Sequence, residues 1–167
     1  LSVDFEVDSL SYGLKWIPDA NREITFSFVD NDSYFATDYS QYNENLAIHE
    51  PTDEFKIAVR EALKLFENVI NVSFVEVEET SSLNGILRYG ITDNINAPAW
   101  ALPPYNKWLN PADLTNYEAY HSAGDIWFNS NRFLANDPNP GNYEFSTILH
   151  ETGHALGLKH PHEAFTN

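Results

Sequence analysis

The feature that most constrains this chain is a cluster of histidines near its C-terminal end, in the segment HETGHALGLKH at residues 150–160. Apolar side chains in and before this segment recur at helical spacing, which predicts a helix over about residues 143–156 with one buried face. The residues of that face are Phe145, Ile148, Leu149, Thr152, Ala155 and Leu156. His150 and His154 are four residues apart, so they project together from the opposite side of the helix.

Gly157 is predicted to end this helix, because glycine readily adopts the left-handed conformation that follows many helices. A reversal there would bring His160 back toward the first two histidines, whereas a continuing helix would carry it about 15 Å away along the axis. Zinc binds imidazole nitrogens, and three protein ligands leave the fourth position of a tetrahedral site open for water. The predicted ligands of one Zn²⁺ ion are therefore His150, His154 and His160.

Glu151 is the predicted catalytic residue, because it follows His150 directly and lies at the edge of the histidine face. Zinc lowers the pKa of a bound water from 15.7 to about 7. A carboxylate beside that water can take its proton as general base and pass it to a leaving amine as general acid. The alternative interpretation is that these histidines are surface side chains of an amphipathic helix.

Composition excludes several other classes of function. The chain has 9 Lys and Arg against 25 Asp and Glu, a formal net charge of −16, which argues against a nucleic-acid partner or an anionic membrane surface. The absence of Cys excludes a thiol nucleophile, disulfides and thiolate zinc ligands. Because no apolar run approaches 18 residues, we expect no membrane span.

The rest of the chain is predicted to form strands around a second helix. Thr52 is a plausible N-cap for a helix that continues to Ile70, with apolar residues at helical spacing. Branched and aromatic residues predict strands at 24–29, 72–77, 85–91 and 125–129. Segments 30–51 and 94–123 are expected to be irregular, and no linker divides the chain, so residues 1–167 are predicted to be a single domain.

The segment at 150–160 resembles the elongated zinc signature of the metzincin endopeptidases, and Pro161 directly after it is similar to the serralysins. Segments 55–75 and 124–133 resemble the family's first helix with its following strand and a strand that leads to the active-site helix. The resemblance implies an α+β metzincin catalytic domain, with a small twisted mixed sheet and two main helices. It also implies a secreted zinc endopeptidase that acts on peptides and proteins.

The family binds extended substrates antiparallel to the outermost strand of its sheet, and one segment resembles that strand. Its predicted substrate-binding residues are Ala99, Trp100, Ala101 and Leu102. Main-chain pairing would supply affinity, and the following Pro103 and Pro104 would protect the edge against unwanted pairing. A proline-rich surface loop is the alternative.

The sequence departs from serralysins after His160, since it ends seven residues later without their Met-turn, Tyr and calcium-binding repeats. We therefore expect the intact polypeptide to continue, and a C-terminal remainder is a possible partner. Calcium would bind mainly in those missing regions. The rival interpretation is a zinc-binding but catalytically incomplete fragment that acts as, or needs, a partner chain.

Weaker signals favour ordinary solvated surfaces. His49, His121 and His162 are expected to face solvent, although His162 is close enough to compete for the metal. The stretches 30–32 and 136–142 offer oxygen ligands of the kind that calcium prefers, but neither fits an EF-hand loop.

Overall fold

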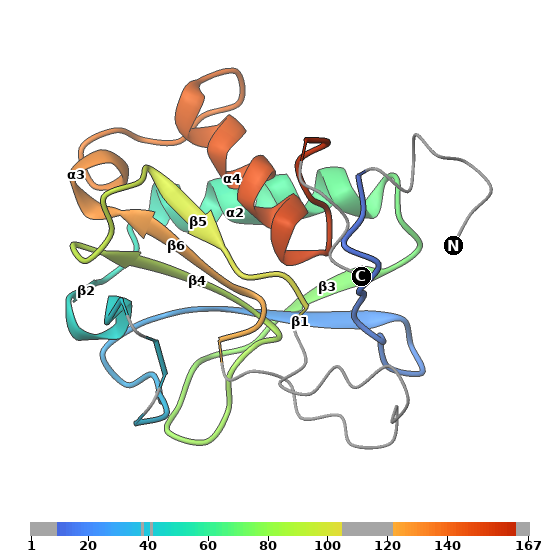
Figure 1. Cartoon of the computed structure of the whole chain (residues 1–167), viewed down its shortest axis with the longest axis horizontal. Coiled ribbons are helices and arrows are strands. Elements are labelled where there is room, and N and C mark those ends of the chain that lie inside the picture. Colours follow the sequence, from blue (N-terminus) through green and yellow to red (C-terminus); the bar gives the residue numbers. More distant parts are fainter. Residues whose placement is uncertain (1–9, 38, 41, 105–121, 163–167) are drawn as a thin grey trace.

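The computed structural model describes residues 10–37, 39–40, 42–104 and 122–162, arranged around one mixed sheet (Figure 1). Strand order along the main path is β3-β1-β4-β6-β5, and a short β2 pairs with β4 off this path. The strands are β1 (Glu23–Phe28), β2 (Ile48–His49), β3 (Ser73–Glu76), β4 (Leu87–Thr92), β5 (Ala99–Ala101) and β6 (Asp125–Asn129). Along this path β3, β1, β4 and β6 run parallel to one another, whereas β5 at the edge is antiparallel to β6.

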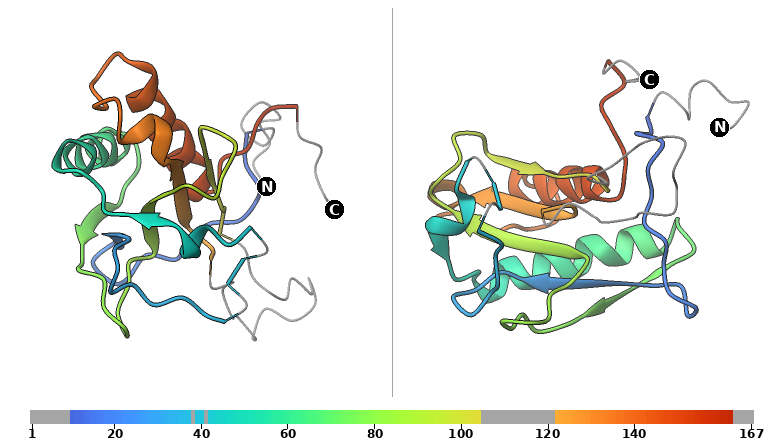
Figure 2. Two further views of the ribbon diagram at one scale, coloured as in Figure 1. Left: turned by 90° about the vertical axis from the view of Figure 1, so that its left-hand side faces the viewer. Right: turned by 60° about the horizontal axis from the view of Figure 1, so that its bottom comes forward.

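Two long helices, α2 (Asp53–Glu67) and α4 (Tyr143–Ala155), lie on the same side of this sheet (Figure 2). They bury Phe55 and Ile148 against sheet residues such as Phe26 and Phe128, so the main apolar core lies between helices and sheet. A single-turn helix α3 (Ser130–Phe133) and a short η1 (Glu44–Leu46) complete the described helices. The α+β class, with a mixed sheet and two main helices, is therefore confirmed.

Helix α2 begins as predicted but ends earlier. The Thr52 hydroxyl accepts a hydrogen bond from the Phe55 backbone N–H at 3.2 Å, which caps the first turn. The helix ends at Glu67, so the prediction that it continues through Val69 to Ile70 is wrong. Both of their N–H groups donate to the Phe66 carbonyl in a terminal turn, which leaves Val69 79% exposed.

Helix α4 carries the predicted buried face. The Asn142 side chain accepts from the Phe145 N–H at 2.9 Å and caps the N-terminus. Ile148, Thr152 and Ala155 are fully buried, and the Tyr89 hydroxyl of β4 lies 3.0 Å from the Thr152 hydroxyl. Burial raises the pKa of Tyr89 above its usual value, so it stays a neutral hydrogen-bonding partner. This contact fixes α4 against the centre of the sheet.

The other face of the sheet carries a buried charged cluster, with Arg88 at its centre. Arg88 donates two hydrogen bonds of 2.7 and 2.8 Å to Glu79, and its Nη1 lies 3.5 Å from Asp125. Tyr39 also donates to Asp125 and accepts from the Trp127 indole N–H. No local sequence pattern predicts this cluster, because its members come from distant parts of the chain.

Among the described residues, none of the helices is both long and apolar enough to cross a membrane.

Candidate metal centre and cleft

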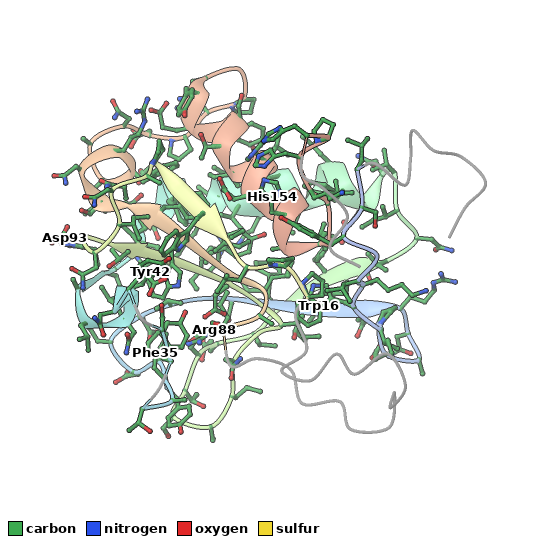
Figure 3. All side chains as sticks on the ribbon, in the orientation of Figure 1. Trp16, Phe35, Tyr42, Arg88, Asp93 and His154 are labelled. Atoms are coloured by element: carbon green, nitrogen blue, oxygen red, sulfur yellow. The ribbon has the colours of Figure 1, made fainter. Side chains whose placement is uncertain are left out.

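The turn after α4 brings the three predicted ligands together. Gly157 adopts a φ of 105°, and its N–H donates to the His154 carbonyl at 2.9 Å, so the chain reverses where the sequence predicts. The Nε2 atoms of His150 and His154 lie 3.0 Å apart. Those of His160 lie 3.1 Å from His150 and 3.2 Å from His154. Three imidazoles from a helix and a loop thus converge on one point, and Figure 3 marks the position of His154 on α4.

These separations fit a tetrahedral metal ion. Nitrogen ligands at 2.0–2.1 Å from zinc lie about 3.3–3.4 Å from one another in an ideal tetrahedron, close to the separations observed. Neutral imidazoles whose lone pairs faced one another at such distances would repel, and a cation between them removes that repulsion. The donor set therefore suits a zinc ion.

The protonation state of the histidines also suits metal binding. His154 Nδ1 lies 2.8 Å from the Leu158 carbonyl, which can only accept, so Nδ1 carries the proton. In this tautomer of the neutral ring, Nε2 is the nitrogen available to a metal, and it faces the other two rings. Burial, together with His154 and His160, lowers the pKa of His150 and favours the neutral form.

Glu151 lies beside this cluster at the base of a cleft between β5 and α4. The cleft has a volume of about 290 Å³ and is lined by Pro98, Ala99, Tyr143, Ser146, Thr147, His150 and Glu151. Burial raises the pKa of Glu151 to about 7, against an opposing effect of His160. A carboxyl group of that pKa can both accept and release a proton near neutral pH.

The predicted substrate strand is an edge strand, but it is shorter than expected, at Ala99–Ala101. Within the described ranges, no strand pairs with its outer side. The Leu102 N–H donates to Asp125 O and its carbonyl accepts from Gly124, both toward β6. Because backbone groups alternate in direction along a strand, those of Ala99 and Ala101 face the open edge.

Trp100 and Leu102 are placed differently from these two alanines. Trp100 is the register partner of Trp127 on β6, and its ring packs on Tyr42 with centroids 4.6 Å apart, on the sheet face away from α4. The backbone of Leu102 is already bonded to β6. Of the four predicted residues, Ala99 and Ala101 are therefore the two whose backbone groups face the outer edge, where no strand pairs with them among the described residues.

The remaining described histidines, His49 and His162, are not part of the three-histidine cluster. His49 lies 2.9 Å from Asp93, and His121 falls outside the described residues. His162 stacks on the His160 ring with centroids 5.3 Å apart, and the metal-binding group among the described residues consists of His150, His154 and His160.

The two candidate calcium stretches form hydrogen bonds within their own loops. The Asp30 carboxylate accepts from Asp32 N at 2.9 Å, and the Asp137 carbonyl accepts from Asn139 and Asn142. Those oxygens satisfy their own turns.

Comparison with known proteins agrees with this geometry. The family profile described as Matrixin matches residues 35–165. The chain therefore belongs to the matrixin family. Within that family it is a serralysin-like metzincin, as Pro161 predicts.

The relatives that it matches are much longer proteins. It is 29% identical over 157 residues to a protein named Serralysin from Proteus mirabilis, covering 88% of this chain and 29% of that protein. It is 50% identical over 46 residues to Serralysin C from Dickeya chrysanthemi, covering 26% of this chain and 9% of that protein. A solved structure of myroilysin matches with a TM-score of 0.48 and 20% identity, covering 89% of this chain and 52% of the other. The chain thus spans less than a third of the length of these serralysins.

Proposed function

We propose that this chain is the catalytic portion of a secreted zinc endopeptidase. The observation that carries the proposal is the convergence of the Nε2 atoms of His150, His154 and His160 within 3.2 Å of one another beside a buried carboxyl group. Membership of the matrixin family supports it. The similarity to serralysins supports action outside the cell.

The three histidines would hold the metal through Nε2. Zinc, when bound, supplies Lewis acidity that polarises a carbonyl group and acidifies water. Glu151 would take the proton of the attacking water and deliver it to the leaving nitrogen of the cleaved bond, which balances the protons of hydrolysis. Its pKa of about 7 suits both halves of that transfer.

The chain's own backbone would orient the substrate. An extended peptide can pair with the outward N–H and C=O groups of Ala99 and Ala101 and so continue the sheet by one antiparallel strand. The adjacent cleft of about 290 Å³ would receive a side chain of that peptide beside Glu151. Small alanine side chains leave room for this approach.

The test is Glu151→Gln, which keeps the size of the side chain but cannot accept a proton. We expect one zinc per chain by elemental analysis and at least a 10²-fold loss in cleavage of a fluorogenic peptide. A His150→Ala variant, assayed in parallel, should lose zinc as well as cleavage. Unchanged cleavage by Glu151→Gln would exclude the proposed proton transfer, and absence of zinc from the unaltered chain would exclude the metal site.

A further inference from the structure

The third histidine differs from the first two in how it is held. His150 and His154 are fixed by α4 itself, whereas His160 lies beyond Gly157, on a segment with no regular secondary structure. The position of a ligand on such a segment depends on the contacts that hold the segment.

The inner side of the turn is held by α4. The Leu158 N–H donates to the Gly153 carbonyl at 2.9 Å, and the Leu158 carbonyl accepts from His154. These contacts fix one residue of the turn against the helix that carries the first two ligands. The carbonyl groups of Ala155 and Gly157 and the N–H of Lys159 form their hydrogen bonds on the outer side of the turn.

The outer side is covered by residues 10–16, which we call the N-terminal clamp. The Tyr12 N–H donates to Gly157 O, and the Lys159 N–H donates to Leu10 O, each at 2.9 Å. Ser11 forms an isolated antiparallel bridge with Leu158 between them. Figures 1 and 2 show this segment beside the end of α4 in every view. The turn is therefore extended into a short two-stranded ribbon.

Trp16 anchors the clamp to the helix. Its indole N–H donates to the Ala155 carbonyl at 2.8 Å, at the last residue of α4. The same ring packs so closely on Gly124 that an added Cβ there would lie 2.9 Å from Trp16 Cζ2. Trp16 thus joins the end of the ligand helix to the start of β6 (Figure 3).

The clamp approaches the turn closely at Gly157. A Cβ at Gly157 would lie 2.5 Å from the Leu14 carbonyl oxygen, so a larger residue would push the two segments apart. The need for glycine here is therefore twofold: a φ of 105° and the approach of the clamp.

We infer that the N-terminal clamp positions His160, with Trp16 as its principal positioning residue, and so contributes to metal affinity without touching the metal. This inference rests on the proposed zinc site. Supporting groups behind metal ligands change metal affinity by roughly 10–100-fold when they are removed. A hydrogen bond to the helix end and two to the turn are contacts of this kind.

The first test is Trp16→Phe, which keeps an aromatic ring but removes the N–H. We expect zinc, titrated against a competing chelator, to bind about tenfold more weakly, with unchanged far-ultraviolet circular dichroism. Bound Co²⁺ should show weaker visible absorption, because its three-nitrogen coordination is loosened. Ile24→Val, a conservative core change in β1 that removes no hydrogen bond, should retain the zinc affinity of the unaltered chain.

The second test is Gly157→Ala, with Gly141→Ala as its matched control. Gly141 has a φ of 98° and no atom within 4 Å of an added Cβ, so both variants carry the backbone strain but only the first meets the clamp. We expect Gly157→Ala to weaken zinc binding at least tenfold and Gly141→Ala to leave it within about twofold.

The outcomes separate the two proposals. Zinc affinities of Trp16→Phe and Gly157→Ala equal to that of the unaltered chain would overturn the clamp while leaving the metal site intact. If the unaltered chain bound no zinc, and His160→Ala changed nothing, the proposed function itself would fail.

Discussion

The two faces of the sheet differ in the side chains that they bury. Toward α2 and α4, β4 and β6 present Leu87, Ile126 and Phe128, all fully buried, in non-directional apolar contact. On the opposite face, the alternate residues of the same two strands are Arg88, 3% exposed, and Asp125, 1% exposed. Strand alternation makes this division possible, because neighbouring residues face opposite ways. The face that packs against α2 and α4 is thus apolar, whereas the opposite face combines an apolar cluster around Trp127 with buried charges and hydrogen bonds around Arg88.

The buried charges around Arg88 stabilise one another. Burial opposes the charge on Glu79, but the hydrogen bonds and charge of Arg88 outweigh it and hold the pKa of Glu79 below its usual value. For Arg88 likewise, Glu79 and Asp125 outweigh burial and raise the pKa further. Asp125 is less well compensated, since within the described part of the chain its Oδ1 is buried without a partner, and burial raises its pKa to about 7.

The largest effect should come from Arg88→Met, which leaves Glu79 and Asp125 facing each other without their cation. Breaking a buried ion pair in this way costs about 3–5 kcal/mol. Ile126→Val, one residue from Asp125 but on the helix face, should cost only about 0.5–1.5 kcal/mol. Urea unfolding of both variants measures the contrast, and equal losses would show that the two faces do not differ as described.

Asp125→Asn should change how stability depends on pH. Between about pH 4 and pH 7 the folded chain keeps the Asp125 proton while the unfolded chain releases it, so this residue's stabilising contribution is complete below pH 4 and lost as pH rises toward 7. The decline is about 4 kcal/mol for a shift of this size. The contribution of Glu79 to stability has the opposite pH dependence, because its pKa is lowered. That contribution is complete above the ordinary pKa of a glutamate and is lost as the pH falls below it.

Thermal unfolding at several pH values, in parallel for both chains, measures this difference. Asp125→Asn should show a flatter profile between pH 5 and pH 7 than the unaltered chain. Identical slopes would rule out Asp125 as the group responsible.

The smallest effect should come from Tyr89→Phe, which removes a hydroxyl contact from the otherwise apolar face. A hydrogen bond of this kind contributes about 1 kcal/mol. Since replacing both partners by apolar groups is close to neutral, Tyr89→Phe combined with Thr152→Val should cost less than the sum of the two single changes. Additive losses in a double-mutant cycle would show that the 3.0 Å contact contributes nothing.

The side of the sheet that packs against α2 and α4 was largely predictable from the sequence, because a long amphipathic helix gives a strong periodic pattern of apolar residues. The buried side of α4, its end before Gly157 and the convergence of His150, His154 and His160 all follow from spacing and from the conformational freedom of glycine. The end of α2 was predicted less well, since Val69 and Ile70 continue its apolar pattern into a turn.

The opposite face of the sheet, which carries Arg88 and Asp125, could not be predicted in the same way. Arg88 and Glu79 are nine residues apart, but Tyr39 and Asp125 are separated by 86, and nothing local marks them as partners. The N-terminal clamp has the same character, since its contacts with the turn arise only from tertiary packing. A hint was available in Arg88, a charged residue inside an otherwise strand-like run.

The bond from Trp16 to Ala155 joins residues 139 positions apart. Closing so long a loop carries an entropic cost that nearby contacts do not, and distant contacts of this kind slow folding. During synthesis the clamp leaves the ribosome long before the turn that it holds. The nascent chain therefore cannot complete its third ligand position until almost all of these residues have been made, so the metal centre assembles only after every strand of the sheet has been synthesised.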